Sequence, residues 1–344
     1  MSTYAFVASH HTVDLTTVAA LSAGASGVPD VLASDMARQL GVKGAVVLAT
    51  CNRLEMYVQL HVSAHVPMVR ELIVESIARA SGLDKELVNS SFDVYADEEA
   101  ARHLLTVASG LESAVVGERE IAGQVRRALA AAQAKAQEDG VPLPGELVQL
   151  FEHAAHTARQ VGQHTALGAQ GRSIVSVALD LADEVAEKDW STRRALIFGT
   201  GAYAGATIAA LRERGCTDIW VNSRSGRAAE FAAKREVSAV PVDGMEQAMA
   251  SADIIIGCSG GSDPLLPEQI PGGHHTILDL ALSRDFDPSV ADLPNVELIT
   301  LESVRLAAPE ETEESVATAT RIVESELVAF LSRQRSRTID SAIV

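Results

Sequence analysis

Long apolar runs are absent from this sequence, and none reaches the roughly 20 residues that a helix needs to cross a bilayer. The N-terminal residues also lack the charged and apolar regions of a secretory signal. Cysteine is rare: Cys51, Cys216 and Cys258 lie too far apart for a disulfide framework or a zinc-binding spacing. These absences predict a cytoplasmic protein with reduced thiols, no bound metal and no membrane contact.

Aromatic residues and positive charges are also scarce. Aromatics make up 4% of the residues while 47% are hydrophobic, which favours Ala- and Val-rich helices over an all-β fold. The 28 basic residues against 46 acidic ones give a net charge of −18. This balance argues against a general nucleic-acid binder, because phosphate contacts need Lys and Arg, although it leaves room for a local basic patch. At 344 residues the chain is long enough for two or three domains.

The first 160 residues mix strand and helix patterns. Strands are predicted at 4–8, 44–50 and 54–60, and helices at 34–41, 66–80, 121–138 and 146–161, with another helix that starts after Asp97 as its N-cap. Residues 54–60 alternate apolar and polar side chains, as in a strand with one polar face. Cys51, Asn52 and Arg53 are therefore expected on the connection between two strands.

The pattern changes at about residues 165–190 to buried strands that alternate with helices. Strands are predicted at 194–199, 218–222, 254–257 and 276–280, and helices at 173–187, 204–214 and, near the end, 310–337. Strand–helix alternation is typical of parallel βαβ units, so an α/β fold with a Rossmann-type domain is expected here.

A glycine-rich turn follows the first of these strands. Its residues are Gly199, Thr200, Gly201, Ala202, Tyr203 and Ala204, which form G-x-G-x-x-A between a strand and a helix. Such a turn lets the backbone approach a pyrophosphate at the helix N-terminus. The next strand ends at Asn222, Ser223 and Arg224 without a carboxylate, and Arg224 suits a 2′-phosphate, so NADP(H) is favoured over NAD(H). The alternatives are a turn that binds nothing and a solvated arginine.

Cys51 is a candidate nucleophile. It lies on a turn two residues before Arg53, and a thiolate is the reactive form of cysteine. Spacing alone leaves a buried structural cysteine equally open. Cys216 is expected to serve packing, whereas Cys258 ends a strand near the nucleotide turn and is the rival nucleophile.

Two stretches closely resemble signatures of the glutamyl-tRNA reductases. ATCNRLEMY, around Cys51, resembles T-C-N-R-x-E-x-Y, and the stretch from His103 to Gln124 resembles H-L-x-x-V-A-S-G-L-D-S-x-V-x-G-E-P-Q-I-x-G-Q. Ser9–Thr12 (SHHT) and residues 278–285 (LDLALSRD) are similar to further family motifs, and the resemblance is collinear over residues 4–340.

The resemblance implies a catalytic α+β domain at 1–160, an NADPH-binding Rossmann domain at 161–305 and a spinal helix at 306–344 with a truncated dimerisation region. Cys51 would attack the ester that joins glutamate to tRNA, and NADPH would reduce the resulting thioester to glutamate-1-semialdehyde for tetrapyrrole (heme) synthesis. Because the two motifs lie in different domains, a domain movement is expected.

The resemblance also assigns residues. His103 matches the family's acid/base histidine, although its position alone favours a histidine with local partners. The positions that match the substrate-holding ones are Thr50, Asn52, Arg53, Ser113, Glu118, Arg119, Glu120 and Gln124. Arg53 suits the substrate carboxylate. Glu55 is expected either to hold the substrate ammonium or to belong to the polar face of a strand.

The sequence departs from the family at several motifs. Glu118-Arg119-Glu120 replaces E-P-Q, so that a carboxylate stands where the family has an amide. Ser283 replaces the proline of P-R-D, and Val13-Asp14 replaces A-P after the histidine motif. A carboxylate at Glu120 accepts from an ammonium but repels a substrate carboxylate.

The expected partners are glutamyl-tRNA(Glu) as substrate, a second copy of the chain in a homodimer that the short C-terminus weakens, and an aminomutase that receives the aldehyde. A local tRNA-binding cluster is predicted at Arg126, Arg127, Lys135 and Arg159, with a solvated helix face as the alternative. Two other functions stay open: a family member that binds tRNA or a partner without reduction, and an NADP-dependent dehydrogenase of a small free substrate.

Overall fold

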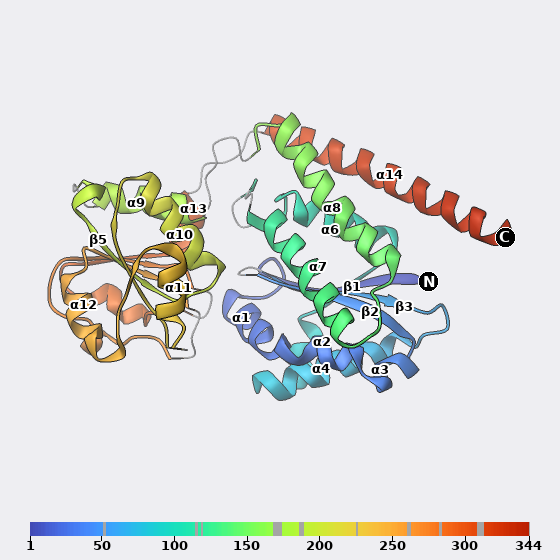
Figure 1. Ribbon diagram of the computed structural model, residues 1–344, viewed down its shortest axis with the longest axis horizontal. Helices are drawn as coiled ribbons and strands as arrows, with labels where there is room; N and C mark the ends of the chain where they lie inside the picture. Colours follow the sequence, from blue (N-terminus) through green and yellow to red (C-terminus); the bar gives the residue numbers. More distant parts are fainter. Residues whose placement is uncertain are drawn as a thin grey trace. The chain divides into compact units, whose positions relative to one another are not determined.

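The structure is a computed structural model that describes residues 1–50, 53–113, 116–117, 120–167, 174–185, 189–224, 226–259, 263–281, 284–307 and 313–343. It comprises two compact units (Figure 1). One consists of Met1–Gly171 with Glu310–Val344, and the other of Arg172–Pro309. Among the described residues, no helix combines the length and the apolar character that a membrane crossing requires.

The first unit is built on a four-stranded antiparallel sheet. Its strands are β1 (Ser2–Ser9), β2 (Val42–Ala49), β3 (Arg53–Leu60) and β4 (Asp93–Ala96), in the order β2-β3-β1-β4. The three strands predicted in this region are confirmed as β1, β2 and β3, whereas β4 was not predicted. Arg53, which was expected on the connection, is the first residue of β3.

Helices cover both faces of this sheet (Figure 1). One layer is formed by α1 (Leu15–Gly24), α2 (Val28–Ala33), α3 (Asp35–Gln39), α4 (Val66–Ser81) and α5 (Lys85–Ser90). The other is formed by α6 (Glu98–Ala108), α7 (Glu120–Glu138), α8 (Gly145–His164) and α14 (Glu313–Ile343). Both faces therefore pack against apolar side chains, which sequence alternation in single strands does not reveal.

The central strand β3 is buried along its whole length. Its apolar face, with Leu54 and Met56, packs on the layer of α1–α5. Its other face carries Glu55, Tyr57 and Gln59, all with 0% exposure, because α6 and α8 cover it. The predicted strand with one polar face is confirmed, and that polar face is buried rather than exposed to water. Polar groups buried in this way need partners.

The start of α6 also differs from expectation. Asp97 occupies the predicted N-cap position but makes no side-chain bond to the helix. Its carboxylate accepts instead from the backbone N–H of Thr3 on β1, at 3.0 Å. A long-range partner has replaced the local cap, and the bond ties the start of α6 to the sheet.

The second unit is built on a parallel sheet of six strands. These are β5 (Arg194–Phe198), β6 (Asp218–Asn222), β7 (Ser238–Ala239), β8 (Ile254–Gly257), β9 (His275–Asp279) and β10 (Val296–Thr300), in the order β10-β9-β8-β5-β6-β7. Its helices are α9 (Ile174–Val185), α10 (Ala202–Glu213), α11 (Ala228–Arg235), α12 (Met245–Ser251) and α13 (Leu301–Ala307). The predicted Rossmann-type sheet is confirmed. The strand order reverses beside β5, where such sheets bind ligands.

The last helix, α14, belongs to the first unit, whereas the sequence suggested a separate region at 306–344. It packs along α6 and α8. Glu324 of α14 pairs with Arg102 of α6 at 2.9 Å, and His153 of α8 lies 2.9 Å from the carbonyl oxygen of Glu326.

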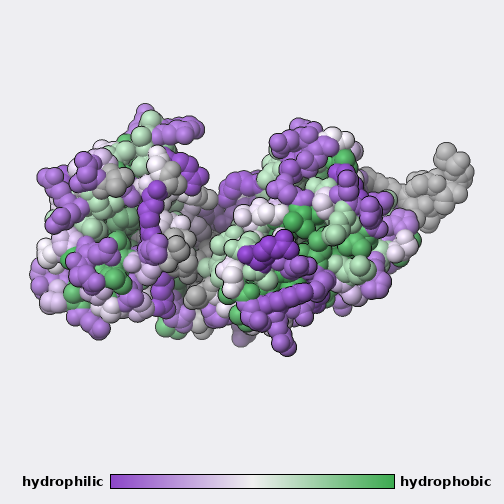
Figure 2. Space-filling view, turned by 90° about the horizontal axis from the view of Figure 1, so that it is seen from below, coloured by the Kyte–Doolittle hydropathy of each residue, from purple (hydrophilic) through white to green (hydrophobic). Residues whose placement is uncertain are grey.

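In Figure 2, hydrophilic residues cover much of the visible surface, in keeping with the charge of the chain.

Candidate active site

A tight hairpin connection between β2 and β3 lies at the centre of the candidate site. The backbone N–H of Thr50 donates to the carbonyl oxygen of Arg53 at 2.9 Å. The two residues between them, Cys51 and Asn52, lie outside the described residues. On the other side of β3, Ser9 at the end of β1 pairs in register with Arg53. The histidines that follow Ser9 are thereby brought to the same end of the sheet as the hairpin.

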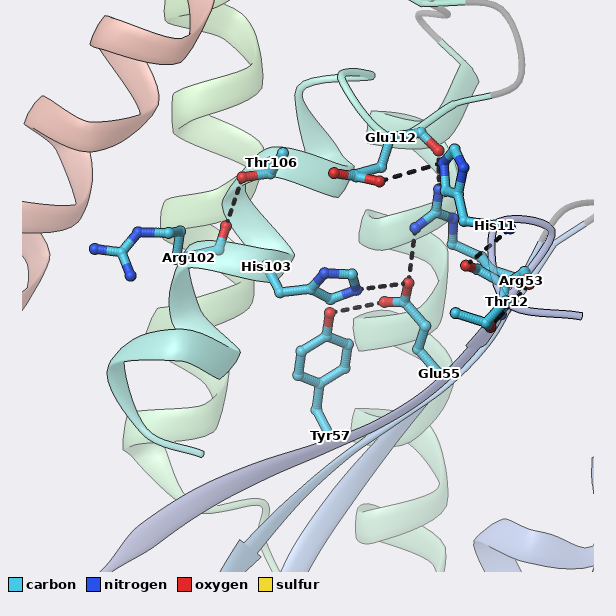
Figure 3. Close-up of polar contacts among 10 residues, drawn as sticks. His11, Thr12, Arg53, Glu55, Tyr57, Arg102, His103, Thr106 and Glu112 are labelled. Atoms are coloured by element: carbon cyan, nitrogen blue, oxygen red, sulfur yellow. Dashed lines mark hydrogen bonds and ion pairs between the residues drawn. The ribbon is translucent and has the colours of Figure 1, made fainter. Parts of the chain in front are cut away.

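The Glu55 carboxylate is the hub of a buried network (Figure 3). Its Oε1 accepts from Arg53 Nη1 at 2.9 Å and lies 3.0 Å from His103 Nε2, and its Oε2 accepts from the hydroxyl of Tyr57 at 2.7 Å. Arg53 is 1% exposed and Glu55 is 0% exposed. Glu55 does belong to the polar face of a strand, which was one of the two expectations, and protein donors already occupy both of its carboxylate oxygens.

The network keeps Glu55 ionised. Burial by itself raises the pKa of Glu55, but the charges of His103 and Arg53 and their hydrogen bonds outweigh it and bring the pKa to about 2. Burial and the Glu55 charge raise the pKa of Tyr57 well above its ordinary value. Glu55 is therefore a fixed negative charge, and Tyr57 is a neutral donor to it.

His103 projects from α6 toward this charge. Its ring stacks on Tyr95 of β4, with centroids 5.0 Å apart and planes 24° apart. The Nε2 atom donates to Glu55, so the ring orientation is set by a carboxylate, as in other carboxylate–histidine pairs. The other ring nitrogen of His103, Nδ1, is therefore the one that can accept or donate a proton in the reaction. The side chain is 14% exposed.

Glu112 and His11 complete the described part of the site, and sequence reasoning assigned no role to either. Arg53 Nη2 donates to the carbonyl oxygen of Glu112, and the Glu112 carboxylate lies 3.3 Å from His11 Nε2 (Figure 3). Gly110 and Gly117 adopt φ angles of 76° and 84° in the connection that carries Glu112. His11 and Glu112 both lie within motifs that resemble family signatures, and this resemblance was the only sequence feature that could have indicated them.

The other predicted substrate residues lie near the start of α7. Ser113 is buried, Glu120 is the first residue of α7, and Gln124 is one turn further on. Glu118 and Arg119 lie outside the described residues. Glu120 Oε2 is buried, has no hydrogen-bond partner among the described residues, and burial raises the pKa of this carboxyl group, against a smaller effect of Arg127. No hydrogen bond between described residues joins Ser113, Glu120 or Gln124 to the Glu55 network.

The glycine turn of the second unit has the geometry that was predicted. Gly199 has φ +114°, and a Cβ there would lie 2.7 Å from the carbonyl oxygen of Cys258, so only glycine fits. Gly201 is the N-cap residue of α10. The hydroxyl of Thr200 is buried without a partner among the described residues. The helix opens with Ala202, Tyr203 and Ala204, of which Ala204 is fully buried.

Arg224 lies at the end of β6, as expected. Its side chain is 47% exposed, and Nη1 donates to the carbonyl oxygen of Asp263 at 2.8 Å. Nη2 lies 3.6 Å from Asp285 Oδ1. The neighbouring Ser223 is buried. Arg224 is thus an accessible cation at the carboxyl edge of the parallel sheet.

Two buried aspartates shape the loops at this edge. Asp279 at the end of β9 accepts from the backbone N–H groups of Ala281, Asp285 and Phe286. Asp285 in turn accepts from the backbone N–H of Ser259 at 2.7 Å. Burial raises the pKa of Asp279 to about 6, the negative charge of Asp285 adds to this effect, and the backbone hydrogen bonds to Asp279 oppose it. These residues close the loops after β8 and β9, and only the resemblance of residues 278–285 indicated them in advance.

The other cysteines differ in their surroundings. Cys216 is fully buried, its thiol donates to the carbonyl oxygen of Arg193 at 3.3 Å, and burial raises its pKa to about 11. It is a packing residue, as predicted. Cys258 is half-buried, with its sulfur 3.6 Å from the hydroxyl of Thr207.

Comparisons with known proteins match both units. The family model described as glutamyl-tRNAGlu reductase, N-terminal domain, matches residues 7–165, and that of shikimate / quinate 5-dehydrogenase matches residues 180–307. The chain is 58% identical to the glutamyl-tRNA reductase of Kocuria rhizophila over 346 residues, covering all of this chain and 77% of that protein. The chain belongs to the glutamyl-tRNA reductase family.

Other members of the glutamyl-tRNA reductase family are similar over the same span. The protein of Pseudarthrobacter chlorophenolicus is 50% identical over 351 residues, covering all of this chain and 78% of that protein. The solved structure of the glutamyl-tRNA reductase from Methanopyrus kandleri is 24% identical, with a TM-score of 0.47, and the match covers 97% of this chain and 80% of that one.

Proposed function

We propose that this chain reduces the glutamate of glutamyl-tRNA to glutamate-1-semialdehyde, the first step of tetrapyrrole synthesis from glutamate, with Cys51 as the nucleophile and NADPH as the reductant. The observation that carries the proposal is the Arg53–Glu55–His103 network, which begins two residues after Cys51. It puts a buried cation and a fixed anion on β3, the strand that follows the cysteine in sequence, and it holds the imidazole of His103 on α6 against them.

The first step is attack of the Cys51 thiolate on the ester carbonyl. The C–S bond forms, the bond from carbon to the ribose oxygen breaks, and the tRNA leaves with a free hydroxyl. A thioester is a better hydride acceptor than an ester, so covalent capture divides one difficult reduction into two easier steps. Glu55 acts as a positioning residue, because it holds both the Arg53 guanidinium and the His103 ring.

The substrate's charges have candidate partners of opposite sign. Arg53 has N–H donors beyond its bonds to Glu55 and Glu112, and we assign them to the substrate carboxylate. Glu120 Oε2, which is buried without a partner among the described residues, is suited to the substrate ammonium. A buried oxygen without a partner is rare in proteins unless a ligand or water completes it, which supports this assignment.

The second unit fits NADPH. The left-handed Gly199, the Thr200 hydroxyl, which is buried without a partner among the described residues, and the N-terminus of α10 suit a pyrophosphate. The accessible Arg224 suits a 2′-phosphate. When bound, this cofactor supplies the hydride. Asp279 and Asp285 hold the adjoining loops in place.

Replacing Arg224 with alanine is expected to weaken NADPH binding by about 10- to 100-fold and NADH binding by less than about threefold, because a charge-assisted bond to a phosphate contributes about 1.5–3 kcal/mol. Titration of nucleotide fluorescence measures both. The control is Lys234→Ala, at an exposed lysine of α11 that pairs with Glu230. Equal losses for NADPH and NADH would contradict the assignment.

Aldehyde formation tests the function and separates it from the two alternatives. Glutamate-1-semialdehyde is expected only when glutamyl-tRNA and NADPH are both present. A non-reducing tRNA-binding protein would retain tRNA and yield no aldehyde. A dehydrogenase of a small substrate would oxidise NADPH without any dependence on tRNA.

The predicted tRNA-binding cluster needs one correction. Lys135 is not free for phosphate, because it pairs with Asp30 at 2.9 Å and with Asp139 at 3.0 Å. Arg126 and Arg127 of α7 and Arg159 of α8 are exposed and form no ion pair with a described residue. We propose these three arginines as the tRNA-phosphate contacts.

Changing Arg126, Arg127 and Arg159 together to glutamine is expected to reduce the slope of log affinity for tRNA against log salt by about 2–3, since each phosphate contact contributes about 0.7–0.9. Filter binding across a salt series measures the slope. Arg79→Gln, an exposed arginine of α4 on the other side of the sheet, is the control. An unchanged slope in the triple variant would exclude this surface.

Two further partners rest on the family resemblance. We propose a homodimer and transfer of the aldehyde to an aminomutase. Sedimentation of the chain alone tests the first, and co-sedimentation with the aminomutase tests the second.

A further inference from the structure

The exposed pair of His11 and Glu112 stands at the rim of the candidate active site, and the catalytic roles assigned so far do not use it. We propose that His11 is the general acid that protonates the ribose oxygen of the departing tRNA, and that Glu112 positions it. This inference rests on the proposed function and adds to it a catalytic residue.

The fold brings His11 to the cysteine-bearing hairpin. β1 ends at Ser9, which pairs with Arg53, and the turn that follows carries His10 and His11. The carbonyl oxygen of Glu112 accepts from Arg53, while its carboxylate lies 3.3 Å from His11 Nε2 (Figure 3). The backbone and the side chain of Glu112 therefore tie His11 to the residue two positions after Cys51.

The pair has the arrangement of a carboxylate-oriented acid. The Glu112 carboxylate faces Nε2, and it is a charge partner for the protonated ring. Nδ1 of His11 has no hydrogen-bond partner among the described residues and is the atom from which a proton can be donated. The other groups that face His11 are the His10 ring, 3.9 Å away between centroids, and Arg53 behind Glu112.

The first step requires such a donor. Expulsion of a ribose alkoxide from the tetrahedral adduct is unfavourable unless the oxygen is protonated as the C–O bond breaks. The thiolate of Cys51 becomes a thioester, the proton moves from His11 Nδ1 to the ribose oxygen, and the imidazole is left neutral. Atoms and charge balance without an added reagent.

Exposure distinguishes His11 from His103 for this role. The His11 side chain is 53% exposed, whereas that of His103 is 14% exposed and is bonded to the fully buried Glu55. The leaving group is the end of a macromolecule, which reaches the rim more readily than the interior. His103 is better placed for the buried acyl group.

Leaving-group dependence tests this role without NADPH. We would compare glutamyl-tRNA with the α-(4-nitrophenyl) ester of glutamate, whose leaving group departs as a stable anion. His11→Gln is expected to slow tRNA release by about 100-fold or more, and the nitrophenolate burst by less than about threefold. Glu112→Gln is expected to show the same selectivity at a smaller amplitude. The control, His61→Gln, changes an exposed histidine that contacts Ser63.

The outcomes separate the two proposals. Equal slowing of both esters by His11→Gln would show a structural role, and no slowing of either would show no role, so each overturns the general acid. If the wild-type chain released neither tRNA nor nitrophenolate through a thioester, the proposed function itself would fail, and the general acid with it.

Discussion

Glutamine in place of Glu55 is expected to lower the free energy of unfolding by about 3–5 kcal/mol, because it leaves the buried Arg53 guanidinium without its counter-charge. Urea denaturation measures the change. Glu71→Gln is the control, since its exposed carboxylate pairs with exposed Lys85, where solvent screens the interaction and little stability is lost. Aldehyde formation should also fall, because His103 loses the acceptor that orients it. If the free energy of unfolding of Glu55→Gln fell by less than about 1 kcal/mol, the proposed role of Glu55 in this network would be contradicted.

The same carboxylate makes stability depend on pH. The pKa of Glu55 is about 2 in the folded chain and 4.5 in its ordinary range. A carboxyl group whose pKa is lower in the folded chain stabilises the fold at pH values above its unfolded pKa. This contribution is lost as the pH falls from about 4.5 to about 2. At about 1.4 kcal/mol per pKa unit it amounts to roughly 3 kcal/mol. The difference between the urea midpoints at pH 6 and pH 3 should therefore be smaller in Glu55→Gln than in the unaltered chain.

Serine in place of Cys51 is expected to reduce aldehyde formation by about 10⁴-fold or more, since removal of a catalytic nucleophile has effects of this size. Serine gives an ester at best, which is no better a hydride acceptor than the substrate. Binding of tRNA and NADPH should persist. Single-turnover assays of aldehyde measure the rate.

Cys258→Ser is the matched variant for that experiment, because Cys258 is the rival nucleophile that the sequence left open. It is expected to retain most of the activity. The reverse result, with activity lost at Cys258 and kept at Cys51, would move the chemistry to the nucleotide unit.

Much of the fold could be predicted because its strands are buried runs of apolar residues. β6 and β8 were predicted at the residues where they occur, since each is bounded by turn residues. β7 was missed because it is two exposed residues long. β4 and β10 were missed because their side chains are partly buried or exposed, except for the buried Ile299 of β10, so their sequences carry little pattern.

The site was predictable as a set of residues but not as an arrangement. Alternation in β3 correctly placed Glu55 and Tyr57 on one face, yet local sequence cannot tell whether water or a helix covers that face. The partner that orients the site, His103, is 48 positions away, and the carbonyl group that holds Arg53 is 59 positions away. For the same reason Lys135 looked free, because its partner Asp30 lies on another helix.

Covalent capture is the central claim, and acid quenching tests it most directly. The chain is mixed with tRNA carrying radiolabelled glutamate, without NADPH, and quenched in acid. We expect close to one label per chain, attached at Cys51, released by hydroxylamine and absent from Cys51→Ser. The account would be contradicted if no label were bound to the protein in this quench while the same preparation formed aldehyde at its full rate once NADPH was added.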